Sequence, residues 1–82
     1  MPNRLADPAH RSAGLKQTLK AINTGRAVRV YLAQDADPEI QKTVRELASK
    51  FQIELEIAES MKQLGKACGI QVQAAAAAIL GD

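Results

Sequence analysis

Three polar side chains near the start of a predicted helix have the spacing of an anion-binding edge. In the stretch "AGLKQTLKAINTG", Lys16 and Lys20 are four residues apart, and Gln17 lies between them. On a helix the two ammonium groups share one side, about 100° around the axis from the apolar stripe. They also stand beside the helix N-terminus, where free N–H groups and the positive dipole end favour anions.

Side chains that commonly perform catalysis are sparse. The single histidine, His10, lies in the N-terminal segment, and the single cysteine, Cys68, falls on an apolar helix stripe with no histidine identifiable as its base. Asp37 is explained as a helix cap. Neither a zinc-ligand spacing nor a phosphate-binding-loop spacing occurs. We therefore expect no catalytic residue, no metal site, no cofactor and no small-molecule substrate.

Charge is unevenly distributed along the 82 residues, although the net charge is only +2. Residues 1–30 carry six Lys or Arg and one Asp, residues 31–60 carry seven acids and three bases, and residues 61–82 carry two Lys and one Asp. Two basic segments around an acidic middle favour a polyanion as partner. A solvated mixture of charges is the alternative.

Cysteine usage and hydropathy indicate the compartment. One cysteine permits no internal disulfide, which fits a reducing setting. The stretch "MPNRLADPAHRSAG" lacks the apolar region of a signal peptide, and no apolar run reaches the roughly 18 residues of a membrane helix. We expect a cytoplasmic protein that does not span a membrane.

Hydrophobic periodicity and capping residues define the elements. We predict a helix over 13–25, a strand over 27–34, a helix over 38–51 capped by Asp37, a strand over 52–60 and a short helix over 61–69 capped by Ser60. The side chains expected to face the core are Leu15, Leu19, Ile22, Val28, Val30, Leu32, Ile40, Val44, Leu47, Phe51, Ile53, Leu55, Ile57, Met61, Leu64 and Cys68. The two strands should form a parallel pair joined by the intervening helix.

The five consecutive alanines near the C-terminus present a conflict between propensity and fold. Alanine favours helix, but a helix here would leave a sheet of two strands, too few for independent stability. We therefore predict a central strand over Ala74–Leu80. Small side chains suit a strand that helices approach closely on both faces. The helical alternative stays open.

The segment before this strand carries two branched apolar side chains where a loop is ordinarily polar. Ile70 and Val72 follow the glycine that ends the preceding helix, with Gln71 between them. Either one of the pair plugs the edge of the core, or both form an apolar platform for a partner.

Three stretches together resemble a known family: "GLKQTLKAINTG", "AQDADPEI" and "ESMKQLGKACGIQVQAAAAAIL". They are similar to the kink-turn-binding RNA proteins of the ribosomal L7Ae type, in particular its short bacterial members, and the resemblance runs from Gly14 to Leu80. It implies an α/β fold, a three-layer α/β/α sandwich with a small mixed sheet whose last segment is a strand. The chain is then a single RNA-binding domain over 1–82.

The resemblance also implies a binding mode. The helix N-terminus would enter the widened major groove of a kink-turn at its tandem sheared G·A pairs, using Gly14, Lys16, Gln17 and Lys20. The loop of Ile70, Gln71 and Val72 would cover extruded nucleotides. Lys16 and Gln17 replace the Asn and Glu of archaeal relatives, and lysine and glutamine can both hydrogen-bond to base edges. Gln71 stands where relatives often have an acid.

The N-terminal segment departs from the family pattern. "ADPAHRSA" lacks the apolar residues that would form a short strand before the first helix, so we predict a mobile arm over 1–12 that contains His10 and Arg11.

The leading hypothesis is a non-catalytic, cytoplasmic, monomeric RNA-binding protein that captures kink-turn RNA and is ribosome-associated, forming a ribonucleoprotein with ribosomal RNA or a riboswitch. The alternative is a protein-interaction adaptor. Its surface would be the acidic edge, which consists of Asp35, Asp37, Glu39, Glu54, Glu56 and Glu59.

Overall fold

A computed structural model of the chain describes residues 4–81. The elements are the short 3-10 turns η1 (Arg4–Ala6) and η2 (Pro8–His10), the strands β1 (Arg11–Ala13), β2 (Ala27–Ala33), β3 (Glu54–Ala58) and β4 (Ala76–Leu80), and the helices α1 (Leu15–Asn23), α2 (Pro38–Lys50) and α3 (Met61–Ala67). Side chains predicted to cap α2 and α3 do so. Asp37 Oδ1 accepts a hydrogen bond from Glu39 N, and Ser60 Oγ accepts one from Gln63 N, each over 3.0 Å.

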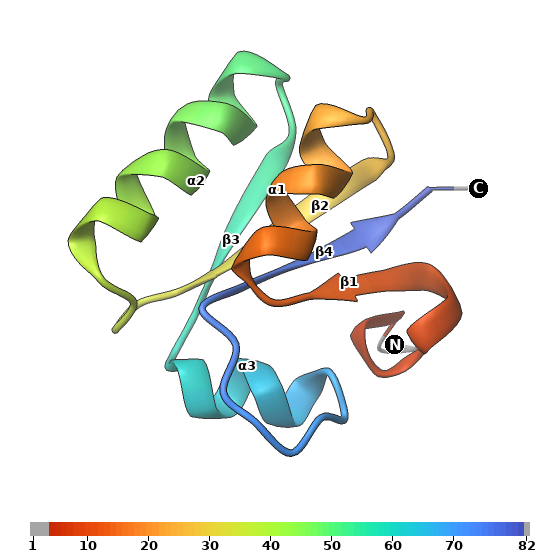
Figure 1. Cartoon of the computed structure of the whole chain (residues 1–82), viewed down its shortest axis with the longest axis vertical. Helices are drawn as coiled ribbons and strands as arrows, with labels where there is room; N and C mark the ends of the chain where they lie inside the picture. Colours follow the sequence, from red (N-terminus) through yellow and green to blue (C-terminus); the bar gives the residue numbers. More distant parts are fainter. Residues whose placement is uncertain (1–3, 82) are drawn as a thin grey trace.

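One mixed sheet with the strand order β1-β4-β2-β3 forms the middle layer. β2 and β3 are parallel, and β4 runs antiparallel to both β1 and β2. Helices α1 and α2 cover one face, while α3 and the N-terminal turns lie on the other (Figure 1). The predicted three-layer α/β/α sandwich with a small mixed sheet is therefore confirmed.

The alanine run forms a central strand, as predicted. β4 begins at Ala76, two residues later than expected, and lies between β1 and β2. Ala76, Ala77 and Ala78 are completely buried, because successive side chains meet helices or turns on opposite faces of the sheet. Tertiary burial thus overrides the helix preference of alanine.

The prediction that no strand precedes the first helix is wrong. Arg11–Ala13 forms β1, which pairs with Ala77–Ile79 of β4 through backbone hydrogen bonds that need no apolar side chain. The apolar anchor of this segment lies upstream at Leu5, which is buried in the core. Within the predicted mobile arm, η1 thus lies against β1 and β4, Arg11 and Ser12 belong to β1, and residues 1–3 are outside the described range.

Three side chains predicted to face the core are exposed instead. Val28 is 54% exposed, at a register irregularity between Ala27 and Arg29 in the pairing with β4. Phe51 stands one residue beyond the end of α2, where the helical stripe no longer continues. Ile57 lies on β3, an edge strand whose faces are incompletely covered.

Candidate nucleic-acid interface

The start of α1 is fixed to the start of β4. Gly14 N donates a hydrogen bond to Ala76 O over 2.9 Å, and Gly14 O accepts one from Thr18 N over 3.0 Å. Gly14 has a φ of 99°, which disfavours any residue with a Cβ, so backbone conformation alone explains the glycine. A Cβ built there would have open space around it, so the backbone is also accessible from outside.

The polar side chains of α1 predicted to bind RNA all face solvent. Lys16, Gln17 and Lys20 are exposed, while Thr18 and Ile22 are buried. The first backbone N–H groups of a helix lack intrahelical acceptors, so this end of α1 offers hydrogen-bond donors together with two ammonium groups. Such an arrangement can bind an anion or the acceptor edge of a base.

The apolar loop folds back along α3. Ile70 N donates to Gly65 O and Ala74 N donates to Met61 O, both over 3.1 Å. Gly65 makes this approach possible: a Cβ at this position would collide with Val72 O and lie 3.2 Å from Gln73 Cα. The helix glycine therefore determines how close the loop lies to α3.

The two apolar side chains of the loop have different environments. Ile70 is partly buried and packs against the core, whereas Val72 is 69% exposed, and Gln71 is also exposed. The loop therefore combines both alternatives raised by the sequence. Ile70 closes the edge of the core, and Val72 is available to a partner.

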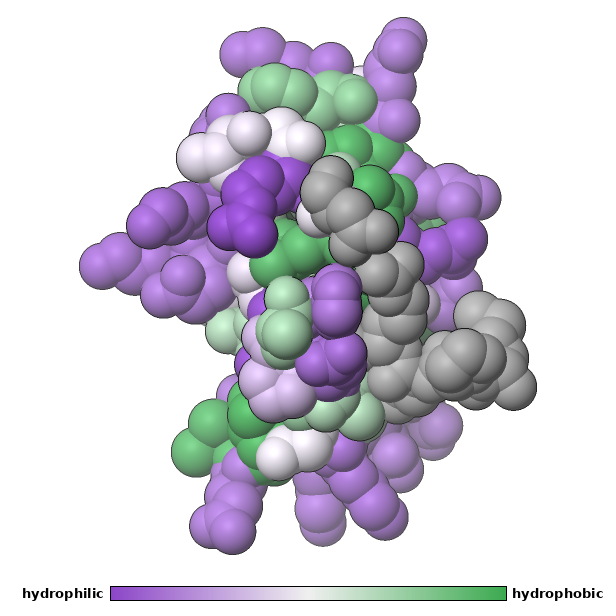
Figure 2. Space-filling view, turned by 90° about the vertical axis from the view of Figure 1, so that its right-hand side faces the viewer, coloured by the Kyte–Doolittle hydropathy of each residue, from purple (hydrophilic) through white to green (hydrophobic). Residues whose placement is uncertain are grey.

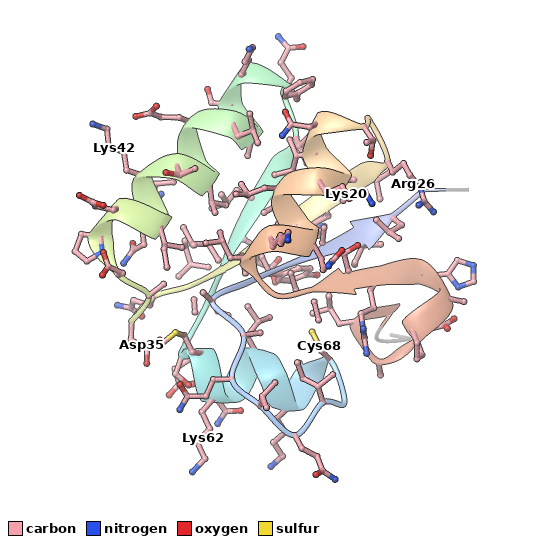
Figure 3. All side chains as sticks on the ribbon, in the orientation of Figure 1. Lys20, Arg26, Asp35, Lys42, Lys62 and Cys68 are labelled. Atoms are coloured by element: carbon pink, nitrogen blue, oxygen red, sulfur yellow. The ribbon has the colours of Figure 1, made fainter. Side chains whose placement is uncertain are left out.

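Lysines that were not predicted as site residues border the loop. Lys62 and Lys66 line an open cavity of about 600 Å³ together with residues 69–73. Their signal in the sequence was their outward position on the helix before the loop. They add positive charge beside Val72, and Figure 3 shows Lys62 projecting away from the body of the molecule below α3.

The two predicted parts of the site meet at β4. Residues 69–75 lead directly into Ala76, whose carbonyl oxygen is hydrogen-bonded to Gly14 N. In Figure 1 the chain after α3 passes close to the beginning of α1 before it enters β4. The polar start of α1 and the apolar loop therefore flank one point of the fold.

Arg11 connects the N-terminal segment to the end of α3. Its Nη2 donates to Cys68 O and its Nε donates to Leu5 O, each over 3.0 Å. Cys68 is the last residue before the turn at Gly69 that leads into the loop. Burial raises the pKa of the Cys68 thiol, and the neighbouring Arg11 guanidinium opposes this to a smaller extent. Cys68 thus lies in the core, as predicted.

Most carboxylates of the acidic edge have local roles. Asp35 Oδ1 accepts from Met61 N over 2.7 Å, at the start of α3. The Arg29 guanidinium forms ion pairs with Glu54 over 2.7 Å and with Glu56 over 3.0 Å. The acidic edge therefore offers a partner less unpaired charge than its composition implied.

Neither a metal-binding cluster nor a membrane-spanning helix occurs within residues 4–81. That range contains no cluster of three or more His, Cys, Asp or Glu suited to a metal ion. None of its helices combines the length and apolar character needed to cross a bilayer.

Several known proteins that are similar to this chain are named as RNA-binding or ribosomal proteins. The family described as "Ribosomal protein L7Ae/L30e/S12e/Gadd45 family" matches residues 4–82. A protein named as an RNA-binding protein of Geobacillus sp. (strain WCH70) is 49% identical over 67 residues, 82% of each chain. The large ribosomal subunit protein eL8 of Halobacterium salinarum is 41% identical over 68 residues, 82% of this chain and 57% of that protein. The solved structure of the Giardia lamblia 15.5kD RNA binding protein has a TM-score of 0.86 and 28% identity, covering 98% of this chain and 68% of its own.

Proposed function

Because the chain belongs to the ribosomal protein L7Ae/L30e/S12e/Gadd45 family, we propose that it is a non-catalytic RNA-binding protein that binds and stabilises kink-turn RNA. The names of its relatives support binding to RNA. The observation that carries the kink-turn proposal is the hydrogen bond between Gly14 N and Ala76 O. It ties the polar start of α1 to the strand that the apolar loop enters, so one RNA could contact both the base-reading side chains and the loop.

The start of α1 would read the groove beside the sheared G·A pairs. The Lys16 ammonium can donate to guanine O6 and N7, and the Gln17 amide can both donate and accept along a base edge. Lys20, one turn further along the helix, would neutralise a phosphate and hold the helix in place. The exposure of all three side chains allows this without rearrangement of the core.

The loop would cover nucleotides extruded from the bend. Val72, the most exposed large apolar side chain in the described part of the chain, would pack on the face of an unstacked base. Ile70 would hold the loop to the core from below. Gln71 would contribute a neutral amide between them, which brings no negative charge near the phosphates.

Binding of this kind stabilises the bent RNA at the expense of the extended one. The apparent affinity is the intrinsic affinity multiplied by the bent fraction, so ions that promote bending should tighten binding. Contacts between lysines and phosphates should weaken as salt rises. We propose that the protein acts as a monomer, because one compact face per chain is sufficient for capture. We also propose that it acts in the cytoplasm, associated with the ribosome or with a riboswitch.

The test is a magnesium-free titration of the protein into a kink-turn duplex labelled with two fluorophores. The control duplex has Watson–Crick pairs in place of the G·A pairs. We expect a bending signal and tight binding for the kink-turn only. Equal affinity for both duplexes, or no binding to either, would overturn the kink-turn proposal.

Two variants, each with a matched control, test whether the apolar loop and α1 are responsible for RNA binding. Val72→Ala removes apolar contact worth about 1.5 kcal/mol, so Kd should rise about tenfold. Ile57→Ala, a change at an exposed apolar side chain on β3, should leave Kd unchanged. Lys20→Ala should weaken binding, and Lys42→Ala should not, because Lys42 lies on the outer side of α2, away from Lys20 (Figure 3).

A further inference from the structure

A second positively charged cavity lies beside α1 and extends from its first turn to the residues that follow its C-terminal end. It has a volume of about 180 Å³, and its walls include Ser12, Gln17, Lys20, Thr24 and Arg26. Its lining includes no Asp or Glu among the described residues. Lys20 and Arg26 lie beside each other at this end of the molecule (Figure 3). Figure 2 shows that the side bearing β1 is mostly hydrophilic, with hydrophobic residues in small patches.

The Arg26 guanidinium has no hydrogen-bond or ion-pair partner among residues 4–81. Arg29 is paired with two glutamates, and Arg11 donates to two carbonyl oxygens. By contrast, the exposed side chains of Arg26 and Lys20 have no hydrogen bond or ion pair with another residue in the range 4–81. Two exposed like charges without an acid from residues 4–81 beside them repel each other mildly, and an external anion would relieve this repulsion.

The backbone around Arg26 is held on both sides. Arg26 N donates to Ala21 O over 2.9 Å, and Arg26 O accepts from Gly81 N over 2.8 Å. Two residues before Arg26, Thr24 closes the helix end through a 2.9 Å hydrogen bond from its Oγ1 to Lys20 O. The backbone that carries the guanidinium is therefore fixed, so only the Arg26 side chain has to be ordered on binding.

We propose that Lys20 and Arg26, with the Ser12 hydroxyl and the Gln17 amide, form a subsite for one RNA phosphate. The planar guanidinium can donate two parallel hydrogen bonds to phosphate oxygens, Lys20 supplies a second positive charge, and the neutral groups supply additional donors. This inference rests on the proposed function and extends it. Gln17 lies in the first turn of α1 and Arg26 follows the end of this helix, so the subsite would fix the RNA backbone along α1, directly beside the base contacts.

A phosphate subsite would fix the register of the protein on its RNA and add affinity, but it would add no preference for particular bases. Phosphate contacts position a protein on its nucleic acid, and base contacts specify the sequence. Loss of Arg26 should therefore weaken binding equally for kink-turns that differ in the sequence of their stems. It should also reduce the number of counterions released on binding.

The experiment measures Kd for the kink-turn duplex as a function of salt for the full chain and its Arg26→Gln variant. The slope of log K against log salt should become shallower by about 0.8, the contribution of one phosphate contact. If the difference vanishes near 1 M salt, the same slope corresponds to about 6-fold weaker binding at 0.1 M and about 2-fold at 0.4 M. Melting curves should show an unchanged Tm, because the Arg26 side chain is exposed.

Arg45→Gln is the matched control, since Arg45 is an exposed arginine on α2, and it should leave the slope unchanged. Arg26→Lys keeps the charge and should retain the slope of the unmodified chain while losing part of the affinity. The subsite is refuted if Arg26→Gln and Arg45→Gln have equal slopes. If the unmodified chain binds the two duplexes equally, the kink-turn proposal fails, yet a slope difference between these variants would still support the phosphate subsite.

Discussion

Replacing Gly65 by alanine tests how the apolar loop is held in place. The added methyl group would collide with Val72 O and crowd Gln73 Cα at 3.2 Å. The loop backbone must then move by on the order of 1 Å to restore van der Waals contact. This movement would stretch the hydrogen bond from Ile70 N to Gly65 O, which is 3.1 Å long.

Two opposing terms determine the size of the effect. Overpacking costs about 1–3 kcal/mol, and replacing glycine by alanine inside a helix returns about 1 kcal/mol. The net loss in free energy of unfolding should be about 1 kcal/mol, which lowers Tm by roughly 4–8 °C in a domain of this size. Opening the loop relieves the overpacking, so the Ile70 amide should exchange with solvent roughly 5- to 150-fold faster.

Hydrogen exchange by NMR, together with thermal melting, measures both quantities. Gln63→Ala is the control, because Gln63 is an exposed residue of the same helix, and its loop amides should exchange at the original rate. Unchanged exchange at Ile70 in the Gly65→Ala variant would refute the reasoning. The variant should also bind kink-turn RNA less tightly, since Val72 would be displaced.

Three further predictions concern residues that support the site. Arg11→Ala removes two side-chain hydrogen bonds, to Leu5 O and Cys68 O, and should lower the free energy of unfolding by about 2 kcal/mol, measured by urea denaturation. Asp35→Ala removes an acceptor from the start of α3 and should cost about 1 kcal/mol in the same assay, whereas Asp35→Asn should recover most of it. Burial raises the pKa of the Cys68 thiol in the folded chain, so its stabilising contribution is complete below the unfolded pKa near 9.0 and is lost as pH rises through the folded pKa. Stability should therefore fall more steeply with alkaline pH in the original chain than in Cys68→Ala, and equal pH profiles would contradict this.

Much of the fold could be predicted because its signals are local. Asp37 and Ser60 cap the two helices that they were expected to begin, since a cap depends on residues within one turn. The alanine strand was predicted against its propensity because the number of strands, a global requirement, left little choice. The face on which Lys16, Gln17 and Lys20 lie followed from helical periodicity, and their role in binding RNA stays a prediction.

The errors arose where the environment of a residue depends on distant parts of the chain. β1 exists because β4 offers it a backbone partner, which no side chain in Arg11–Ala13 announces. Periodicity marked Ile57 as buried, but its strand lies at the sheet edge. The sequence indicated no role for Arg26, because the cavity that Arg26 lines also includes Ser12 and Lys20. Only the pairing of β1 with β4 brings Ser12 to that place.

The sequence alone determined the order of the three helices and of β2, β3 and β4, the α/β class and the family resemblance, because periodicity, caps and motifs depend on residues close together in the chain. Tertiary structure decided which apolar loop residue is exposed, which arginines are paired within residues 4–81 and where two distant segments meet. These properties depend on packing between layers. Gly65 sets the position of the loop, and the hydrogen bond from Gly14 N to Ala76 O joins the start of α1 to β4, the strand that follows the loop. Long-range contacts of this kind arise only when the chain closes on itself, so local patterns do not encode them.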